Sequence, residues 1–446
     1  MRKMLAIIAA KISIILGKIL GKKSSSTPGT IARKICPDIL KHLAKQVKEK
    51  TILVCGTNGK TTTTNLLYSL IKNEGKEVVC NNVGANMLDG ITCAFVTKAS
   101  IFGKLNADYA VLECDEAYLR HVVKHVNADR IVITNLFRDQ LDRYGEIDAT
   151  VKLLDEAFSN IKNDFELILN GDDPLCAHYA DKYKAKFYGI SEDKNLKKNE
   201  IKEGRFCLKC QSELSYNFCH YSQLGDFYCP KCGYKRHAPH YDAVNIDLDN
   251  KMKFDIKYNN HTITLDVNYK GFYNIYNILA AFSAYNELGL DLTNINNVFN
   301  SYKPQIGRME TFRINNKDVI LNLSKNGAGF NQAISTLIND QREKDVFFVL
   351  NDAPSDGTDI TWLWDVDFEY LKNANINSIY SGGIRKDDLA IRILYAGFDN
   401  VKVMDNTKDN LKDIIFASDR PVYLLVNYTA LFDTQNILKS LEKSSK

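Results

Sequence analysis

A glycine-rich segment, GTNGKTTT at Gly56–Thr63, constrains the fold of this chain more than any other feature. It follows an apolar run, TILVC, that is typical of a buried strand, and it precedes a segment with the pattern of a helix, TTTTNLLYSLIKN. A tight turn between a strand and a helix exposes backbone N–H groups that attract phosphate oxygens. The segment therefore predicts a phosphate-binding loop in an α/β fold, formed by Gly56, Thr57, Asn58, Gly59, Lys60, Thr61 and Thr62.

The side chains of this loop suit a nucleoside triphosphate. Lys60 brings a mobile positive charge to the outer phosphates, and the hydroxyl of Thr61 or Thr62 is a ligand for Mg²⁺. The loop is shorter than the common phosphate-binding loop, whose spacing requires a glycine where this chain has Val54. An ordinary turn rich in Gly, Asn and Thr is the structural alternative, but the succession of strand, Gly-Lys-Thr and helix favours a phosphate site.

Alternating strands and helices continue on both sides of a cysteine-rich insert, and 446 residues suggest two or three domains. Before the insert, strands are predicted at Tyr109–Cys114, Arg130–Asn135 and Glu166–Asn170, the rhythm of a mostly parallel sheet. After it, a strand-rich stretch at 243–267 and a helix at 273–288 are expected. A second α/β segment follows, with strands at Asp318–Leu321, Asp345–Asn351, Ser378–Gly383 and Val422–Asn427.

The insert, residues 204–234, carries two Cys-x-x-Cys pairs whose separation is that of a zinc ribbon. Four thiolates form a closed tetrahedral site, which predicts a structural Zn²⁺ held by Cys207, Cys210, Cys229 and Cys232. A redox-active pair is the alternative, but two motifs at this spacing favour the metal. Cys219 and His220 lie between the pairs and are expected to be packing residues rather than ligands.

The net charge and the cysteine count argue against a nucleic-acid-binding protein and against a disulfide-rich secreted protein. Lys and Arg total 58 against 54 Asp and Glu, a net charge of +4, which is too small to argue for a nucleic-acid partner. The 11 cysteines are mostly scattered and do not suggest a disulfide framework. A reducing cytoplasm fits them better.

The first residues are apolar and dotted with lysines. Lys11 interrupts the apolar run, so no stretch reaches the roughly 18–20 residues of a membrane-spanning helix, and Lys11 and Lys18 fit a signal peptide poorly. Two interpretations stay open: a helix packed on its own domain, or a helix lying at an anionic membrane surface. The composition of Gly21–Gly29 predicts a linker, followed by a short helix from Ile39 to Val47.

The shortened loop resembles the ATP loop of the Mur ligases and folylpolyglutamate synthetases, and further motifs follow in that family's order. Glu113, at the end of a predicted strand, matches a Mg²⁺-binding glutamate. Segments 134–146 and 169–174 resemble N-x-x-x-D-H-L-D-x-x-G and N-x-D-D-P. Segments 271–281 and 307–310 resemble the adenine-side G-x-x-N-x-x-N-x-x-A-A and G-R-x-E. Each motif is weak alone, but six in order are specific.

This resemblance implies an enzyme that uses ATP and Mg²⁺. It places Thr61 and Glu113 at Mg²⁺, and at the nucleotide, besides the loop, Asn274, Asn277 and Arg308. Two departures affect metal handling. Gln140 stands where many members have histidine, and the family's carbamoylated lysine has no clear counterpart, which puts a second Mg²⁺ in doubt.

The cysteine insert narrows the resemblance to the MurT branch of the family. Segments Pro28–Ala44, Leu321–Ala333 and Asn351–Glu369 also resemble MurT sequences. MurT is the ligase-like subunit of the enzyme that amidates lipid II, and it pairs with the glutaminase GatD. The resemblance implies a heterodimer that uses ammonia from glutamine to convert D-isoglutamate of the lipid II stem peptide to D-isoglutamine, through an acyl phosphate, in peptidoglycan synthesis.

In that family a ligase-subunit aspartate completes the Cys–His pair of the glutaminase. Asp352, Asp356 and Asp359 are candidates, and we expect Asp356, in an Asp-Gly turn, to orient the histidine. The alternative is a turn capped by its own side chain. Two other functions stay open: a stand-alone Mur-type amino-acid ligase, which would need no glutaminase, and a non-enzymatic binding module, which would not hydrolyse ATP.

The expected fold class is therefore α/β. An N-terminal helical segment, 1–50, precedes a Mur-ligase-type central ATP-binding domain, 51–305, whose mostly parallel sheet carries the zinc ribbon at 204–234. A C-terminal α/β domain, 306–446, is expected to contact the glutaminase. The expected location is the cytoplasm, with peripheral contact to the inner face of the cell membrane left open.

Overall fold

The computed structural model divides the chain into two units, which are described separately. The first comprises Met1–Phe137, Ile147–Asn195 and Glu203–Tyr302, and the described part of the second lies within Lys303–Lys446. The residues described are 1–19, 25–81, 84–137, 147–194, 204–248, 251–268, 271–302, 307, 309–417 and 419–445.

The first unit is built on a nine-stranded sheet in the order β11-β10-β9-β6-β5-β4-β1-β3-β2. The strands from β2 to β9 in this order are parallel, and β10 and β11 add an antiparallel edge. Their residues are rich in Val, Ile and Leu and almost wholly buried in the parallel part, as expected for strands covered on both faces. The strands are β1 Lys50–Cys55, β2 Val78–Cys80, β3 Tyr109–Glu113, β4 Arg130–Ile133, β5 Glu166–Asn170, β6 Ala185–Ile190, β9 Tyr241–Asp247, β10 Met252–Tyr258 and β11 His261–Val267.

Helices cover this sheet. Helix α10, Tyr273–Asn286, has 12 of its 14 residues buried, and it packs against α4, Lys60–Asn73, and against the central strands. Both follow the patterns predicted from the sequence. The other helices described in this unit, beyond the N-terminal group, are α5 Leu88–Lys98, α6 Leu119–Val122, α8 Ile147–Ser159, α9 Pro174–Ala177, η1 His178–Asp181 and α11 Ile295–Ser301.

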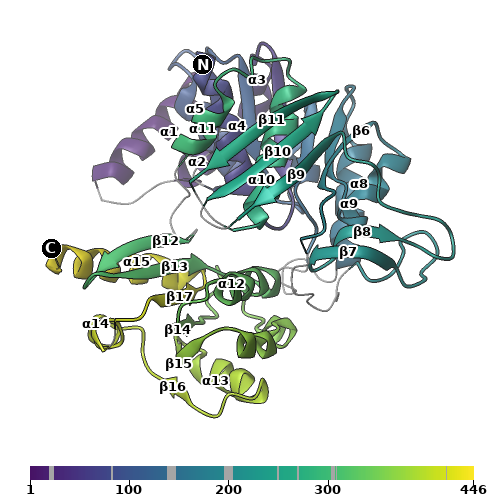
Figure 1. Cartoon of the computed structure of the whole chain (residues 1–446). Coiled ribbons are helices and arrows are strands. Elements are labelled where there is room, and N and C mark those ends of the chain that lie inside the picture. The colour runs from purple at the N-terminus through teal and green to yellow at the C-terminus, as the bar shows by residue number, and fades with distance from the viewer. Residues whose placement is uncertain are drawn as a thin grey trace. The chain divides into compact units, whose positions relative to one another are not determined.

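Three N-terminal helices belong to the same unit: α1 Arg2–Ile19, α2 Thr27–Ile35 and α3 Ile39–Ala44. Helices α1, α2 and α5 lie side by side (Figure 1). Among the described helices, none is both long enough and apolar enough to cross a membrane.

The predicted linker at 21–29 is wrong at its end, because α2 begins at Thr27. Pro28 occupies the first turn, where its missing N–H costs no hydrogen bond and its fixed φ favours helix. A Cβ on Gly29 would lie 1.9 Å from the carbonyl oxygen of Asp89. This glycine therefore serves close contact between α2 and α5 rather than chain flexibility.

The cysteine-rich insert forms a two-stranded antiparallel ribbon, β7 Ser215–Tyr221 and β8 Leu224–Tyr228, between β6 and β9. It packs on the unit near α9, where the Tyr234 hydroxyl donates to the Pro174 carbonyl (Figure 1). The insertion of a small ribbon into a mostly parallel sheet is the arrangement predicted from the sequence.

The second unit has a six-stranded sheet in the order β12-β13-β17-β14-β15-β16, in which only β12 is antiparallel to its neighbour. Buried clusters lie on both faces, so this unit has its own α/β core, and the predicted fold class is confirmed. Its elements are β12 Glu310–Ile314, β13 Lys317–Leu323, α12 Gly327–Asn339, β14 Lys344–Val349, η2 Thr361–Asp365, η3 Phe368–Asn373, β15 Ile376–Gly382, α13 Lys386–Tyr395, β16 Val401–Val403, α14 Lys408–Phe416, β17 Val422–Val426 and α15 Tyr428–Ser444.

Candidate functional site

The predicted phosphate loop lies between the carboxyl end of β1 and the N-terminus of α4. Gly56 and Gly59 have φ of +119° and +87°, a region that favours glycine. A Cβ on Gly59 would lie 2.1 Å from Oδ1 of Asn277, so the backbone passes directly against α10. The N-cap residue of α4 is Gly59, which has no side chain to cap the helix, and the N–H groups of a helix N-terminus favour an anion.

The end of β4 fixes the conformation of this loop. The Thr57 N–H donates to the Asn135 carbonyl at 2.8 Å, and the Asn58 N–H donates to Asn135 Oδ1 at 2.9 Å. The Thr57 hydroxyl donates to the Phe137 carbonyl at 3.0 Å. The loop is therefore held in place by the neighbouring strand, as pre-organised anion binding requires.

Lys60 is buried and folded back over the loop. Its Nζ donates to the carbonyl of Thr57 at 3.2 Å and lies 3.2 Å from Oε2 of Glu116. It also donates to the Gly56 carbonyl. A buried ammonium beside a helix N-terminus is a strong attractor for phosphate oxygens. Glu116 was not singled out from the sequence, although the run Glu113-Cys-Asp-Glu116 is a visible signal of clustered carboxylates.

Glu113 ends β3, whose register pairs it with Val54 immediately before the loop. Its side chain is buried, and Oε1 accepts from Asn86 Nδ2 at 3.1 Å. Within the described part of the chain, its Oε2 has no hydrogen-bond partner. A buried carboxylate oxygen with open lone pairs, at the end of the strand beside the phosphate loop, fits the donor set that Mg²⁺ prefers. Thr61, half-buried in the first turn of α4, offers a hydroxyl of the same kind.

The predicted adenine-side residues lie against the phosphate loop. Asn277 Nδ2 donates to Asn274 Oδ1 at 3.1 Å, and the Asn277 carbonyl accepts from the Thr63 hydroxyl at 3.5 Å. Asn277 therefore lies against Gly59 of the loop, and Asn274 contacts Asn277; binding of the nucleotide by these two residues stays a prediction. Arg308 and Gln140 lie outside the described residues.

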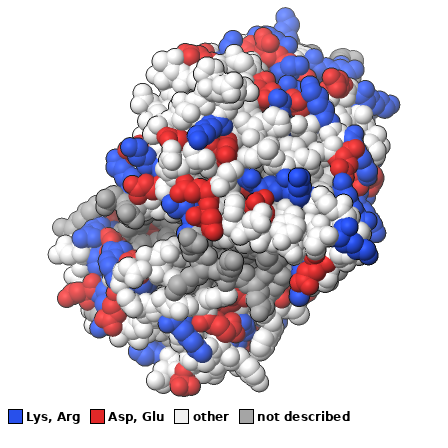
Figure 2. Space-filling view, turned by 45° about the vertical axis from the view of Figure 1, so that its right-hand side comes forward, with Lys and Arg blue, Asp and Glu red and all other residues white. Residues whose placement is uncertain are grey.

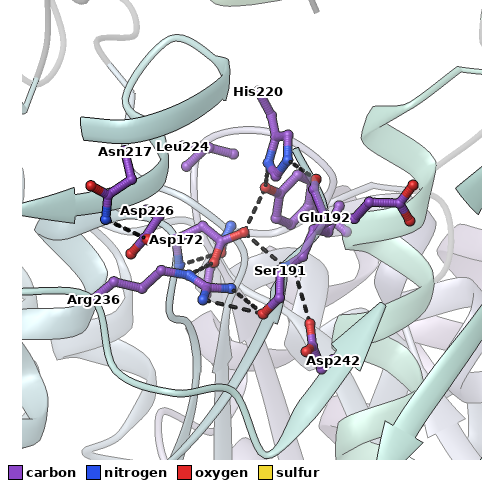
Figure 3. A network of polar contacts seen from close by, with 12 residues as sticks. Asp172, Ser191, Glu192, Asn217, His220, Leu224, Asp226, Arg236 and Asp242 are labelled. Carbon is purple, nitrogen blue, oxygen red and sulfur yellow. Dashed lines mark hydrogen bonds and ion pairs between the residues drawn. The ribbon is translucent and has the colours of Figure 1, made fainter. Parts of the chain in front are cut away.

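A buried polar network connects the ribbon with α10 (Figure 3). Asp172 accepts from Arg236 Nε at 2.6 Å and from the Tyr276 hydroxyl at 2.7 Å. The Tyr276 hydroxyl lies 2.8 Å from Nδ1 of His220 on β7. Because Tyr276 precedes Asn277, this network fixes the part of α10 that contacts the phosphate loop. Sequence reasoning missed it, since its members are far apart in the chain.

A second connection runs from the ribbon to the end of β4. Gln223 Nε2 donates to the Leu136 carbonyl at 2.7 Å, and Leu136 N–H donates to Asp173 Oδ2 at 2.8 Å. Burial raises the pKa of Asp173 to about 6, although hydrogen bonds from the N–H groups of Leu136 and Leu175 favour its charged form. The ribbon therefore supports the residues that hold the phosphate loop.

The four predicted zinc ligands form one cluster, with all four sulfurs within 4.8 Å of one another. The sulfurs of Cys207 and Cys232 are 3.5 Å apart, as are those of Cys210 and Cys229. Tetrahedral Zn²⁺ with bonds of about 2.3 Å separates its sulfurs by about 3.8 Å, so the cluster fits the ion. A hydrogen bond from the Ser212 backbone N–H helps lower the pKa of Cys210 to about 6, which favours the thiolate.

The residues between the cysteine pairs have other partners. Cys219 Sγ donates to the Ser222 carbonyl at 2.9 Å, and His220 contacts Tyr276 and the Glu192 carbonyl. Neither residue belongs to the four-cysteine cluster. They pack within the ribbon and against the unit, as predicted.

The three candidate aspartates of the second unit, Asp352, Asp356 and Asp359, are each engaged in contacts within that unit. Asp356 is buried, and its two carboxylate oxygens accept from the N–H and the hydroxyl of Thr429 in the first turn of α15. Asp352 pairs with Arg385 at 2.7 Å, and Asp359 accepts from the Thr361 N–H at 2.8 Å. In this chain alone, Asp356 thus stabilises a helix N-terminus.

The charged residues on one face of the described chain are mixed in sign. Basic and acidic residues are interspersed on the face shown in Figure 2. This mixed distribution agrees with the small net charge and does not resemble the basic stripe of a nucleic-acid interface.

Both halves of the chain match known protein families. Residues 54–229 match the Mur ligase middle domain, which implies ATP use, and residues 323–431 match the MurT ligase C-terminal domain. The chain is 36% identical over 398 residues to subunit MurT of lipid II isoglutaminyl synthase (glutamine-hydrolyzing) from Staphylococcus aureus strain COL, covering 89% of this chain and 88% of the relative. The Streptococcus pneumoniae R6 MurT subunit is 34% identical over 442 residues, covering 98% and 97%.

Solved structures support the fold. A pseudomurein peptide ligase type C from Methanothermus fervidus has a TM-score of 0.70 at 23% identity, covering 91% of this chain and 81% of that one. MurF ligase from Thermotoga maritima, solved in complex with ADP, has a TM-score of 0.65 at 13% identity, covering 94% and 85%. At these identities the likeness concerns the fold alone.

Proposed function

The chain belongs to the MurT family, the ligase subunits of glutamine-hydrolysing lipid II isoglutaminyl synthase, and we propose that it amidates the α-carboxylate of D-isoglutamate in the lipid II stem peptide. The observation that carries the catalytic part is that the buried Lys60, at the start of α4, folds back over the phosphate loop, while Glu113 ends the strand that pairs with β1 just before that loop. These groups suit transfer of a phosphoryl group between two anions. The product is D-isoglutamine, and the step belongs to peptidoglycan synthesis.

The proposed reaction has two steps. A substrate carboxylate oxygen attacks the γ-phosphorus of ATP, the bond to ADP breaks, and an acyl phosphate forms. Ammonia then attacks the carbonyl carbon, phosphate leaves with the carboxylate oxygen, and a proton is lost to give the amide. Mg²⁺, when bound, neutralises phosphate charge, and Glu113 and Thr61 are the residues that would hold it. Lys60 and the loop amides stabilise charge on the transferred group.

An isotope experiment tests this route. Lipid II labelled with oxygen-18 in the D-isoglutamate α-carboxylate is incubated with the chain, ATP, Mg²⁺ and ammonium. The acyl phosphate route transfers one labelled oxygen to inorganic phosphate for each amide formed. Amide formation with unlabelled phosphate would contradict it.

We also propose that a GatD-type glutaminase is the partner subunit and that Asp356 orients its catalytic histidine. The buried carboxylate of Asp356 is already fixed by Thr429, which supplies the rigidity that such a role needs. Asp352, which pairs with Arg385, and Asp359 are the alternative candidates.

Asp356→Asn is expected to lower glutamine-driven amidation about 10³-fold in the presence of the partner and to leave ammonium-driven amidation within about twofold. The physical reason is that an amide stabilises a histidine cation poorly. Initial rates with each nitrogen source measure this. If Asp356 only stabilises α15, the glutamine-driven rate, the ammonium-driven rate and the melting temperature of the variant all fall, which would contradict the orienting role. Asp352→Asn and Asp359→Asn are the matched controls.

We propose that Cys207, Cys210, Cys229 and Cys232 bind a structural Zn²⁺ that stabilises the ribbon. Cys207→Ser is expected to abolish stoichiometric zinc and to lower the melting temperature by roughly 5 °C, since zinc binding is coupled to folding of such a site. Zinc content and thermal unfolding measure this. Cys219→Ser, in the same ribbon but outside the cluster, should retain zinc, and a Cys207→Ser chain that keeps its zinc would contradict the assignment.

We propose the cytoplasm, at the inner face of the cell membrane, as the place of this activity. A lipid-linked substrate supports that location, because its stem peptide is presented at a membrane surface.

A further inference from the structure

Helix α1 has two opposite apolar faces. Ala6, Ala10 and Gly17 lie buried on the inner face, toward α2 and α5. Six large aliphatic side chains on the other side are between 37% and 75% exposed: Leu5, Ile8, Ile12, Ile15, Leu16 and Ile19. An outward face of a helix is ordinarily polar, so this composition needs a cause other than packing within the unit.

The six side chains form one stripe. At about 100° per residue they fall within an arc of about 100° on the helix, opposite the buried face. A neighbouring turn adds Ile101 and Phe102, which are 47% and 68% exposed. This turn lies beside α1, since a Cβ on Gly103 would be 3.6 Å from Cδ1 of Ile7. The stripe and these two turn residues are called the α1 face below.

Basic residues border this stripe. Helix α1 contains Arg2, Lys3, Lys11 and Lys18 and has no Asp or Glu. At helical spacing Lys11 and Lys18 lie along one border of the stripe and Arg2 lies along the other. Lys11 Nζ donates to the Thr97 carbonyl and Arg2 Nε donates to the Ile35 carbonyl, so both side chains are held at the sides of the helix, and Lys18 is exposed.

From this arrangement we propose that the α1 face docks on an anionic lipid surface, with the helix lying in the plane of the interface. Aliphatic side chains and Phe102 would enter the boundary between headgroups and acyl chains, and the flanking lysines would meet acidic headgroups. A second copy of the chain is a poorer occupant, because its basic borders would repel those of the first. The proposal deepens the proposed function, on which it rests for the membrane-bound substrate.

Co-sedimentation of the purified full chain with vesicles tests this docking. Vesicles of phosphatidylglycerol and phosphatidylcholine are compared with vesicles of phosphatidylcholine alone. We expect binding to the anionic vesicles and at least a tenfold weaker partition for the double variant Ile12→Glu, Ile15→Glu, whose side chains are solvent-exposed in the fold. The control is Ile391→Glu, Leu394→Glu, on exposed positions of α13, which should bind as wild type does.

Three outcomes overturn the proposal. The first is equal vesicle binding by the Ile12→Glu, Ile15→Glu variant and the control, and the second is no vesicle binding by the wild-type chain. The third is an oligomer that this variant dissociates while vesicles are not bound, which would make the α1 face a self-interface.

The failure of this docking is distinguishable from failure of the proposed function. With ammonium as nitrogen source, the Ile12→Glu, Ile15→Glu variant should amidate detergent-solubilised lipid II at the wild-type rate. It should amidate vesicle-embedded lipid II at least tenfold more slowly than the wild-type chain does. A wild-type chain that binds vesicles but amidates neither substrate contradicts the function and leaves the docking standing.

Discussion

Lys60→Met is expected to lower kcat/KM for ammonium-driven amidation of lipid II by about 10³-fold. The loss has a direct cause, because the variant removes the buried cation that lies over the phosphate loop, 3.2 Å from the Thr57 carbonyl. Methionine keeps most of the apolar length of the side chain, so the loop retains its packing. Initial rates as a function of ATP concentration measure the effect.

The control for this variant lies on the same helix. Lys72 is near the end of α4, is 43% exposed and forms an ion pair with Glu77 at 2.9 Å. Lys72→Met should leave the rate within about twofold, because an exposed ion pair contributes little. If Lys60→Met retained a third of the wild-type rate with an unchanged melting temperature, the assignment of Lys60 to phosphoryl transfer would be wrong.

Glu113→Gln is expected to lower the rate about 100-fold at fixed Mg²⁺ and to raise the Mg²⁺ concentration required for half-maximal rate more than tenfold. Glutamine has nearly the same shape, and its side-chain oxygen can still accept from Asn86. What is lost is the negative charge on the buried oxygen that has no partner among the described residues. Rates over a series of Mg²⁺ concentrations measure both quantities.

Glu77→Gln is the matched control. Glu77 is 38% exposed and pairs with Lys72 and Lys98, outside the candidate site. Its Mg²⁺ dependence should equal that of the wild-type chain. A Glu113→Gln chain with the same Mg²⁺ dependence as this control would remove Glu113 from the metal site.

The phosphate loop and the cysteine cluster could be predicted from the sequence because their chemistry is local. Gly56 and Gly59 are required by their positive φ, and Lys60 is positioned by its place at the start of α4. The cysteine cluster is recognisable from the spacing within and between the two Cys-x-x-Cys pairs. Most strands of the two sheets could likewise be predicted from apolar runs between turn residues. The strands β2, β6, β12 and β16 were missed.

What could not be predicted depends on contacts between distant segments. Glu116 pairs with Lys60 across 56 positions, and Gln223 reaches the Leu136 carbonyl across 87. The start of α2 was missed because a Pro-Gly pair suggests a turn, whereas here the proline opens a helix and Gly29 permits close packing on α5. The burial of Asp356 was missed because its partner, Thr429, belongs to the last helix.

Mass spectrometry of lipid II tests the central claim most directly. The purified chain is incubated with lipid II, ATP and Mg²⁺, with either ammonium or glutamine, and with or without a GatD-type glutaminase. We predict that the α-carboxyl group of D-isoglutamate in the stem peptide becomes an amide. With ammonium this should occur with or without the glutaminase, and with glutamine only when the glutaminase is present. An unchanged lipid II in every mixture, with ATP consumed once an amino acid is added, would contradict the amidation and indicate an ordinary amino-acid ligase.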